Sequence, residues 1–308
     1  MTRPLGTVAG YDVRAAVTFR FLREAGGVRG DPIDVREAEV EPPPDDVEPL
    51  LRWVRRPDNP FEASLYAVGE RYVMAIPGMG TFRIVPGGRA IEIPPGADPV
   101  RREARLWGVP AALMATTRGD LPVHAATVEV DGRALLLCGP SRFGKTTLAV
   151  GFMREGHRVL SEDLSCCRVD GSAAVLPGPA LLRVRRDVHD RLGPFASTSI
   201  AAEDDDRVHL SLDGRLRGTG DPVPLAGVVV LRRGAEVPEL FPVAPERFIP
   251  ELFTMSFGLP TDADRARSFG AVAALAGAAP MWVLDRPLRF DVLGDVVSLL
   301  IDRCVPSA

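Results

Sequence analysis

The chain has 308 residues, of which 46% are hydrophobic and 25% are charged, which is typical of a globular protein with an ample buried core. Its 37 basic and 41 acidic residues nearly balance, so charge gives no reason to expect a nucleic acid or a membrane surface as partner. No apolar stretch is as long as a membrane span, and the first residues lack a secretory signal, so we expect a cytoplasmic protein.

Residues 1–115 are predicted to form a smaller α/β domain, and residues 116–308 a larger second domain. The elements expected in the first are strands at 17–22 and 71–76, a hairpin of 82–85 with 90–93, and helices at 98–107 and 111–117. This domain contains no chemical motif. A purely structural role and recruitment of an acceptor are both open.

An Asp-Gly dipeptide, Asp131-Gly132, lies between two strand-like runs, which is the strongest short-range signal for a β-hairpin. With these two residues as the turn, the register sets His124 opposite Gly139. The hairpin therefore predicts an imidazole beside the phosphate-binding pattern that begins at Gly139, where it could hold phosphate or metal. A partly exposed strand histidine without chemistry is the alternative.

Residues 139–146 fit the phosphate-binding pattern G-x-x-x-x-G-K-[ST]. An apolar run at 134–138 precedes the pattern and a helix-compatible run at 146–155 follows it. Backbone N–H groups of such a loop and of the helix N-terminus converge on an anion. Lys145 is predicted to bind the β- and γ-phosphates of ATP, and Thr146 to bind Mg²⁺. The predicted nucleotide-binding residues are Gly139, Ser141, Arg142, Phe143, Gly144, Lys145, Thr146 and Thr147.

Two carboxylates, Glu162 and Asp163, follow a predicted strand at 158–161. A right-handed crossover would bring this strand back beside the loop strand if the two are parallel. Carboxylates there could hold Mg²⁺ and accept a proton from an attacking hydroxyl. Because successive strand residues face opposite sides, both reach one site only if the strand ends or bulges there. A solvated acidic turn is the alternative.

A second Asp-Gly dipeptide, Asp170-Gly171, predicts another hairpin. With these two residues as the turn, Asp163 faces Gly178, which lies in a rigid Pro-Gly-Pro turn. That turn is expected either to form a wall near the active centre or to be only a strand-breaking loop, and no chemistry is assigned to it.

The remainder of the chain predicts further α/β structure. The expected elements are strands at 181–184, 225–231 and 281–284, and helices at 185–193, 246–253, 265–276 and 291–303. An acidic run at 203–206 is expected to be a solvated loop, with a second metal site as the alternative. Arg265, Arg267 and Arg286 are candidates for the cation that stabilises a transferring phosphoryl group. The four cysteines, at 138, 166, 167 and 304, are expected to be reduced and mainly buried.

Together these residues resemble the HPr kinase/phosphorylase family and its bacterial relatives, which include the kinases of lasso-peptide and similar peptide-maturation pathways. The resemblance rests on residues 123–125, 139–147, 154–157 and 162–163, and it extends over about residues 121–190. It implies a core of the HPr-kinase and phosphoenolpyruvate-carboxykinase type, with the P-loop in a mixed sheet with antiparallel hairpins.

The resemblance also implies roles for individual residues. Glu162 corresponds to the general base and Asp163 to a metal ligand together with Thr146, while Lys145 holds the triphosphate and His124 matches the family's histidine. The implied reaction is ATP- and Mg²⁺-dependent transfer of the γ-phosphoryl group to a Ser or Thr hydroxyl. The acceptor would be a peptide or small protein, such as an HPr-like protein or a precursor peptide.

Two positions depart from the family pattern. The family commonly has Ser-Gly where this chain has Ser141-Arg142, and Asp-Asp where it has Glu162-Asp163. The longer glutamate could weaken catalysis or move the base role to Asp163. No counterpart of the C-terminal phosphorylase segment is found, so the reverse reaction is not expected. A small-molecule P-loop kinase and a catalytically weak nucleotide-binding regulator are the alternatives, and a homo-oligomer is compatible with the sequence.

Overall fold

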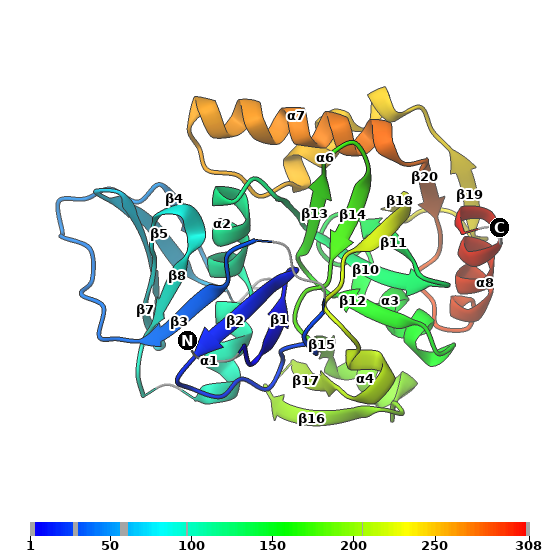
Figure 1. The fold of residues 1–308 in the computed structure, drawn as a ribbon. Coiled ribbons are helices and arrows are strands. Elements are labelled where there is room, and N and C mark those ends of the chain that lie inside the picture. The colour runs from blue at the N-terminus through cyan, green and yellow to red at the C-terminus, as the bar shows by residue number, and fades with distance from the viewer. Residues whose placement is uncertain (1–3, 27–29, 56–60, 97, 205, 306–308) are drawn as a thin grey trace.

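The computed structural model describes residues 4–26, 30–55, 61–96, 98–204 and 206–305. These residues form mixed α/β structure with three sheets of eight, nine and three strands (Figure 1). No helix in the described ranges is both long and apolar enough to cross a membrane.

The eight-stranded sheet is formed by the N-terminal part of the chain, in the order β1-β2-β3-β8-β7-β6-β5-β4. Its strands are β1 (Gly6–Val8), β2 (Tyr11–Ala15), β3 (Ile33–Glu37), β4 (Leu51–Trp53), β5 (Ala63–Val68), β6 (Arg71–Ile76), β7 (Gly80–Ile84) and β8 (Ala90–Ile93). The short helix η1 (Pro86–Gly88) lies between β7 and β8, and helices α1 (Pro99–Leu106) and α2 (Val109–Thr117) follow β8. The predicted strand at 71–76, the β7–β8 hairpin and both helices are confirmed.

The predicted strand at 17–22 is wrong, because these residues form an irregular connection between β2 and the rest of the molecule. Their backbone groups find partners outside any sheet. The buried Glu103 carboxylate of α1 accepts the N–H groups of Arg20 and Phe21 at 2.6 and 2.7 Å, and the Phe21 carbonyl accepts from the Ala180 N–H at 2.7 Å. Apolar side chains such as Phe21 still bury, which explains why the segment resembles a strand in sequence.

The nine-stranded sheet is mixed and follows the order β12-β10-β11-β18-β14-β13-β9, with β20 beside β18 and β19 beside β20. Its strands are β9 (Leu121–Val123), β10 (Ala125–Val130), β11 (Arg133–Cys138), β12 (Arg158–Ser161), β13 (Ser165–Val169), β14 (Ala173–Leu176), β18 (Val223–Arg232), β19 (Glu239–Pro242) and β20 (Met281–Asp285). Strands β11, β18 and β20 are parallel to one another, so their carboxyl ends lie at one edge, where α/β sheets bind ligands.

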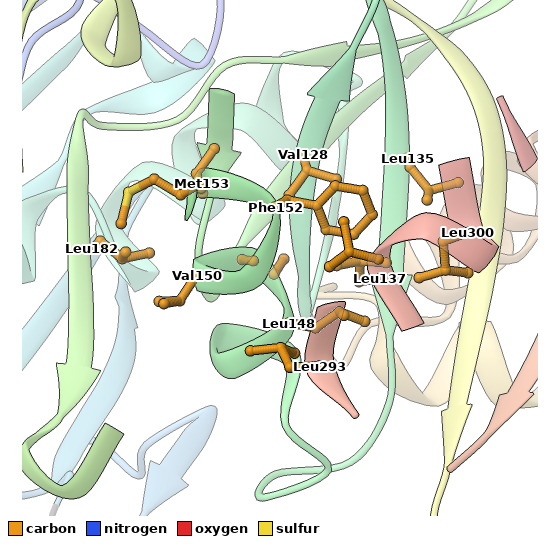
Figure 2. Close-up of a cluster of buried hydrophobic side chains, with 14 of the residues drawn as sticks. Val128, Leu135, Leu137, Leu148, Val150, Phe152, Met153, Leu182, Leu293 and Leu300 are labelled. Atoms are coloured by element: carbon orange, nitrogen blue, oxygen red, sulfur yellow. The ribbon is translucent and has the colours of Figure 1, made fainter. Parts of the chain in front are cut away.

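Alternating side chains of β11 bury against two helical layers. Leu135 and Leu137 pack in one apolar cluster with α3 (Lys145–Arg154) and α8 (Leu293–Cys304). Leu136 packs in another with α6 (Ile249–Met255) and α7 (Asp262–Ala278). In Figure 2, Phe152 of α3 points toward Leu137 and Leu300. The sheet is thus the middle layer of three, and α3 packs on one of its faces against β10 and β12.

A three-stranded sheet, in the order β15-β17-β16, completes the fold. The remaining elements are β15 (Leu181–Arg185), α4 (Arg186–Leu192), β16 (Thr198–Glu203), β17 (Arg207–Leu212), α5 (Gly214–Arg217) and η2 (Pro245–Arg247). The acidic run at 203–206 is only partly a loop, because Glu203 ends β16 and Asp204 pairs with His209 and Arg101; residue 205 lies outside the described residues.

All four cysteines are free and buried, as expected for small apolar side chains.

Candidate active site

The first hairpin brings His124 to the glycine loop. Strands β10 and β11 pair in the predicted register, with Ala125 opposite Cys138, because the Asp-Gly turn fixes the alignment. The ladder ends at this pair, and the His124 N–H donates to the Met255 carbonyl at 2.7 Å rather than to Gly139. The imidazole nevertheless reaches the loop through its side chain.

Lys145 links His124 to the glycine loop. Its Nζ lies 3.0 Å from His124 Nε2, 2.8 Å from the Gly139 carbonyl and 3.1 Å from the Pro140 carbonyl. An ammonium only donates, so Nε2 of His124 must accept. The proton of a neutral imidazole is then on Nδ1, which lies 3.0 Å from the carbonyl oxygen and 3.3 Å from the carboxylate of Asp163.

Lys145 is also unusual in composition, because it is the only lysine in a chain with 36 arginines. Its side chain is buried, and burial lowers the pKa of its ammonium although the Asp163 and Glu162 charges act in the opposite direction. The chain thus has a compact ammonium, which differs chemically from a guanidinium, at the lysine position of the sequence pattern G-x-x-x-x-G-K-[ST].

The acidic pair converges on one arginine. Strand β12 ends at Ser161, and both following carboxylates turn to Arg183 of β15: Nε lies 3.1 Å from Glu162 and Nη2 lies 2.7 Å from Asp163. The second Glu162 oxygen accepts from the Thr146 hydroxyl at 2.9 Å. The strand thus ends directly before the two carboxylates, which meets the condition under which both can reach one site.

The position of β12 differs from the prediction in one respect. It runs in the same direction as β11 but is not beside it, because β10 inserts between the two as an antiparallel strand. Helix α3 therefore crosses over one intervening strand, and its first turn still lies next to the acidic pair.

The two carboxylates differ in exposure and charge environment. The Glu162 side chain is 6% exposed, whereas that of Asp163 is 48% exposed. Desolvation by the surrounding protein atoms favours the neutral form of Asp163 even though its side chain is half-exposed, but the Arg183 guanidinium and the His124 hydrogen bond outweigh this effect and hold the pKa of Asp163 well below its usual range. Asp163 is therefore an ionised carboxylate that solvent can reach.

Arg183 was not predicted as a site residue. The sequence signal was an arginine between two buried positions of an apolar strand, Leu182 and Val184, but a partner 20 residues away cannot be read from spacing. Of the three candidate arginines, Arg286 lies at the loop, with Nη2 3.3 Å from the Gly144 carbonyl. The other two belong to α7, where Arg267 pairs with Asp264.

The second hairpin has a three-residue loop, 170–172, rather than the predicted two-residue turn. The extra residue shifts each facing pair by one position, so the prediction that Asp163 faces Gly178 is wrong. Gly171 takes a left-handed φ of 85° within the longer loop. The Pro-Gly-Pro turn still adjoins the acidic segment, because the Gly178 N–H donates to the Leu160 carbonyl at 2.9 Å.

The remaining predicted loop residues surround the start of α3. Ser141 and Arg142 are exposed, and Thr147 is half-buried in the first turn. The Phe143 ring lies under the Arg233 guanidinium at 4.9 Å, so its aromatic face is covered by a cation from the end of β18.

Arg142 adopts a left-handed backbone conformation, with φ of 65°, at the position where the family pattern has glycine. We expect Arg142→Gly to raise the free energy of unfolding by about 0.5–1 kcal/mol. The substitution relieves backbone strain in the folded state, and this gain exceeds the cost of the greater conformational entropy of the unfolded chain. Urea denaturation measures the change, with Arg142→Ala, which keeps the strain, as the control. A lower stability of the glycine variant than of the alanine variant would contradict this expectation.

A small cavity of about 40 Å³ adjoins the acidic pair. It is lined on one side by Glu162, Asp163 and Arg183, and on the other by Ala104 and Trp107 at the end of α1, together with Gly108, Ser161, Leu164, Pro179 and Leu181. A larger groove of about 450 Å³ lies in the eight-stranded sheet beside Trp53 and Tyr66. Of these two, the small cavity is the one that includes the acidic pair.

Comparisons with known proteins agree with part of this description. No family model matches the chain. In structure it is similar to the Hpr(Ser) kinase/phosphatase from Coxiella burnetii, with a TM-score of 0.33 and 10% identity over 59% of this chain and 94% of that one, which is too low to carry an argument. In sequence it is 34% identical over 62 residues to HPr kinase/phosphorylase from Lactobacillus acidophilus. This match spans 20% of the chain and 19% of that relative. Over that short segment, the chain resembles HPr kinase/phosphorylase in sequence.

Proposed function

We propose that the chain is an ATP- and Mg²⁺-dependent kinase that phosphorylates a Ser or Thr hydroxyl of a peptide or small protein. The observation that carries the proposal is the convergence of Lys145, His124 and the Glu162-Asp163-Arg183 cluster at the N-terminus of α3. The short similarity to a protein named HPr kinase/phosphorylase supports the same reaction class.

The glycine loop is proposed to bind the triphosphate. Backbone N–H groups at the start of α3 and the positive end of its dipole attract an anion. The Lys145 ammonium, now held by two loop carbonyls and His124, would exchange these neutral acceptors for phosphate oxygens, which form stronger charge-assisted hydrogen bonds.

The residues at this site fit Mg²⁺. The Thr146 hydroxyl and the Glu162 carboxylate are oxygen donors 2.9 Å apart, and Mg²⁺ in nucleotide sites takes few protein ligands beside phosphates and water. The absence of any cluster of three or more His, Cys, Asp or Glu side chains suited to a metal among the described residues does not conflict with such a site. When bound, Mg²⁺ neutralises charge on the β- and γ-phosphates.

We assign Asp163 as the proton acceptor and Glu162 to the metal side. The sequence suggested the reverse, but the contacts favour this division because Glu162 is buried against Thr146, whereas Asp163 is half-exposed and oriented by His124. In the transfer, the acceptor oxygen bonds to the γ-phosphorus while the bond to the β,γ-bridging oxygen breaks. The acceptor proton passes to Asp163 and ADP leaves.

The small cavity supports a macromolecular acceptor over a small molecule. A space of about 40 Å³ beside the carboxylates accommodates a group of roughly hydroxymethyl size rather than a whole metabolite, since ligand pockets enclose about 300–1,000 Å³. We propose that residues 1–115 form a separate domain before residues 116–308. Because α1 of this domain contributes one wall of the cavity, we propose that the domain helps to bind the acceptor.

The test is incubation with ATP, Mg²⁺ and candidate acceptors, namely an HPr-like protein and any precursor peptide encoded beside this chain. Mass spectrometry then looks for an added phosphate on a Ser or Thr of the acceptor, with Lys145→Ala as the control. We expect a phosphate that depends on Lys145. Binding of ATP with no transfer to any acceptor would instead favour the nucleotide-binding regulator.

A further inference from the structure

Arg286 lies directly after β20, at the edge of the sheet where the glycine loop begins. Because β11, β18 and β20 are parallel, residues that follow β20 emerge on the same side as those that follow β11. The Arg286 side chain turns toward the loop, with Nη2 3.3 Å from the Gly144 carbonyl, and the residue is only 1% exposed.

The charge of Arg286 is poorly compensated. Its second contact, from Nη1 to the Pro287 carbonyl, is 3.5 Å long, and its buried Nε has no hydrogen-bond partner. Among the ion pairs of the described residues, none involves Arg286. Burial alone lowers its pKa to about 10, so the guanidinium is still charged at neutral pH.

Arg23 shows what a structural buried arginine looks like in the same molecule. It is also 1% exposed, but its guanidinium donates to five backbone carbonyls: Gly178, Leu216, Arg217, Val159 and Leu160. A buried charge without such partners is destabilising by itself. The comparison indicates that Arg286 is retained for a reason other than stability.

The glycine loop is shaped to fit this guanidinium. Gly144 has φ of 80°, and a Cβ added there would lie 2.5 Å from Arg286 Nη2. Gly144 also precedes Lys145 and caps the N-terminus of α3. The contact therefore places a fixed positive charge behind Gly144, at the N-terminus of α3, where the glycine loop ends.

We propose that Arg286 is a positioning residue that supplies positive charge behind the glycine loop and so strengthens binding of the nucleotide's phosphates without touching them. The inference rests on the proposed function, because it needs a nucleotide at the loop. In a buried position the field of the guanidinium is weakly screened, and it adds to the helix dipole at the same anion. The effect should grow with the number of phosphates.

The experiment measures the dissociation constants of ATP, ADP and AMP by calorimetry for the full chain and for Arg286→Met and Arg286→Lys. We expect Arg286→Met to weaken ATP binding about tenfold and AMP binding about twofold, and Arg286→Lys to retain most of the ATP affinity. Arg289→Met is the matched control, because Arg289 lies in the same loop, is exposed and pairs with Asp291. It should bind all three nucleotides as the unmodified chain does.

Melting of the nucleotide-free variants separates charge from structure. If Arg286 only anchors the loop, Arg286→Met should have a lower melting temperature and should lose equal affinity for ATP and AMP. That outcome overturns the inference. The charge role predicts an unchanged or higher melting temperature for Arg286→Met.

If Arg286→Met does not fold, Arg286→Lys provides the test, because it keeps the positive charge. If Arg286→Lys no longer binds ATP more tightly than AMP by the same ratio as the unmodified chain, the inference is also overturned. An unmodified chain that binds no ATP removes the proposed function itself, whereas ATP binding that Arg286→Met leaves intact removes only this inference.

Discussion

Replacing Lys145 with alanine is expected to reduce the rate of phosphoryl transfer by at least about 10²–10³-fold, the loss typical for one preorganised electrostatic contact. The ammonium is the compact cation of the glycine loop, and its three present acceptors are neutral groups within 3.1 Å. Each can be exchanged for a phosphate oxygen. ATP binding should also weaken, by about tenfold.

Initial rates with the identified acceptor and calorimetric ATP titration measure both effects. Arg133→Ala is the matched control, because Arg133 begins β11 on the exposed surface and its loss changes the net charge equally. Undiminished turnover of Lys145→Ala would remove the phosphate-loop proposal. Equal losses in both variants would point to net charge rather than to the loop.

Substitutions of the two carboxylates are expected to affect different steps, with Asp163 acting on the rate and Glu162 on the Mg²⁺ requirement. Asp163→Asn is expected to lower the maximal rate by about 10²–10⁴-fold, because an amide cannot accept the acceptor's proton, while ATP affinity changes little. Glu162→Gln is expected to raise the Mg²⁺ concentration needed for half-maximal rate about tenfold, because a charged oxygen beside Thr146 is lost. Rate measurements over a Mg²⁺ series distinguish the two variants.

The opposite pattern would reverse the assignment. If Glu162→Gln loses turnover at saturating Mg²⁺ and Asp163→Asn keeps it, Glu162 is the base, as the family resemblance implies. His124→Ala provides an independent check, because His124 contacts Asp163 and not Glu162. It should lower the rate in an otherwise normal chain but add little to the loss in Asp163→Asn.

The local features of the site could be predicted because short-range rules determine them. The two-residue Asp131-Gly132 turn fixes the register of β10 with β11, and the strand, glycine loop and helix follow each other without a gap. The second Asp-Gly pair showed the limit of this reasoning. There the same dipeptide belongs to a three-residue loop. The added residue shifts every facing pair of β13 and β14 by one position.

Long-range partners could not be predicted from the sequence. Arg183 meets the acidic pair only because the three-stranded sheet packs beside β12, and β16 and β17 of that sheet were themselves missed. The first five strands of the N-terminal sheet were also missed, although Tyr11–Ala15 and Ile33–Glu37 alternate apolar and polar residues, because these strands are only three to six residues long. Residues 17–22 were wrongly predicted as a strand because the carboxylate of Glu103, 83 residues from Arg20 and 82 from Phe21, replaces the ladder partner.

The single lysine of the chain has a chemical consequence. Apart from the terminal α-amino group, Lys145 Nζ is the only aliphatic amine in the protein. Any acylating or carbamylating reagent that modifies a side-chain amine must therefore act on the glycine loop, so the extent of labelling reports directly on access to that one atom. Protection by a ligand could then be read from one peptide, with no second lysine to confuse the signal.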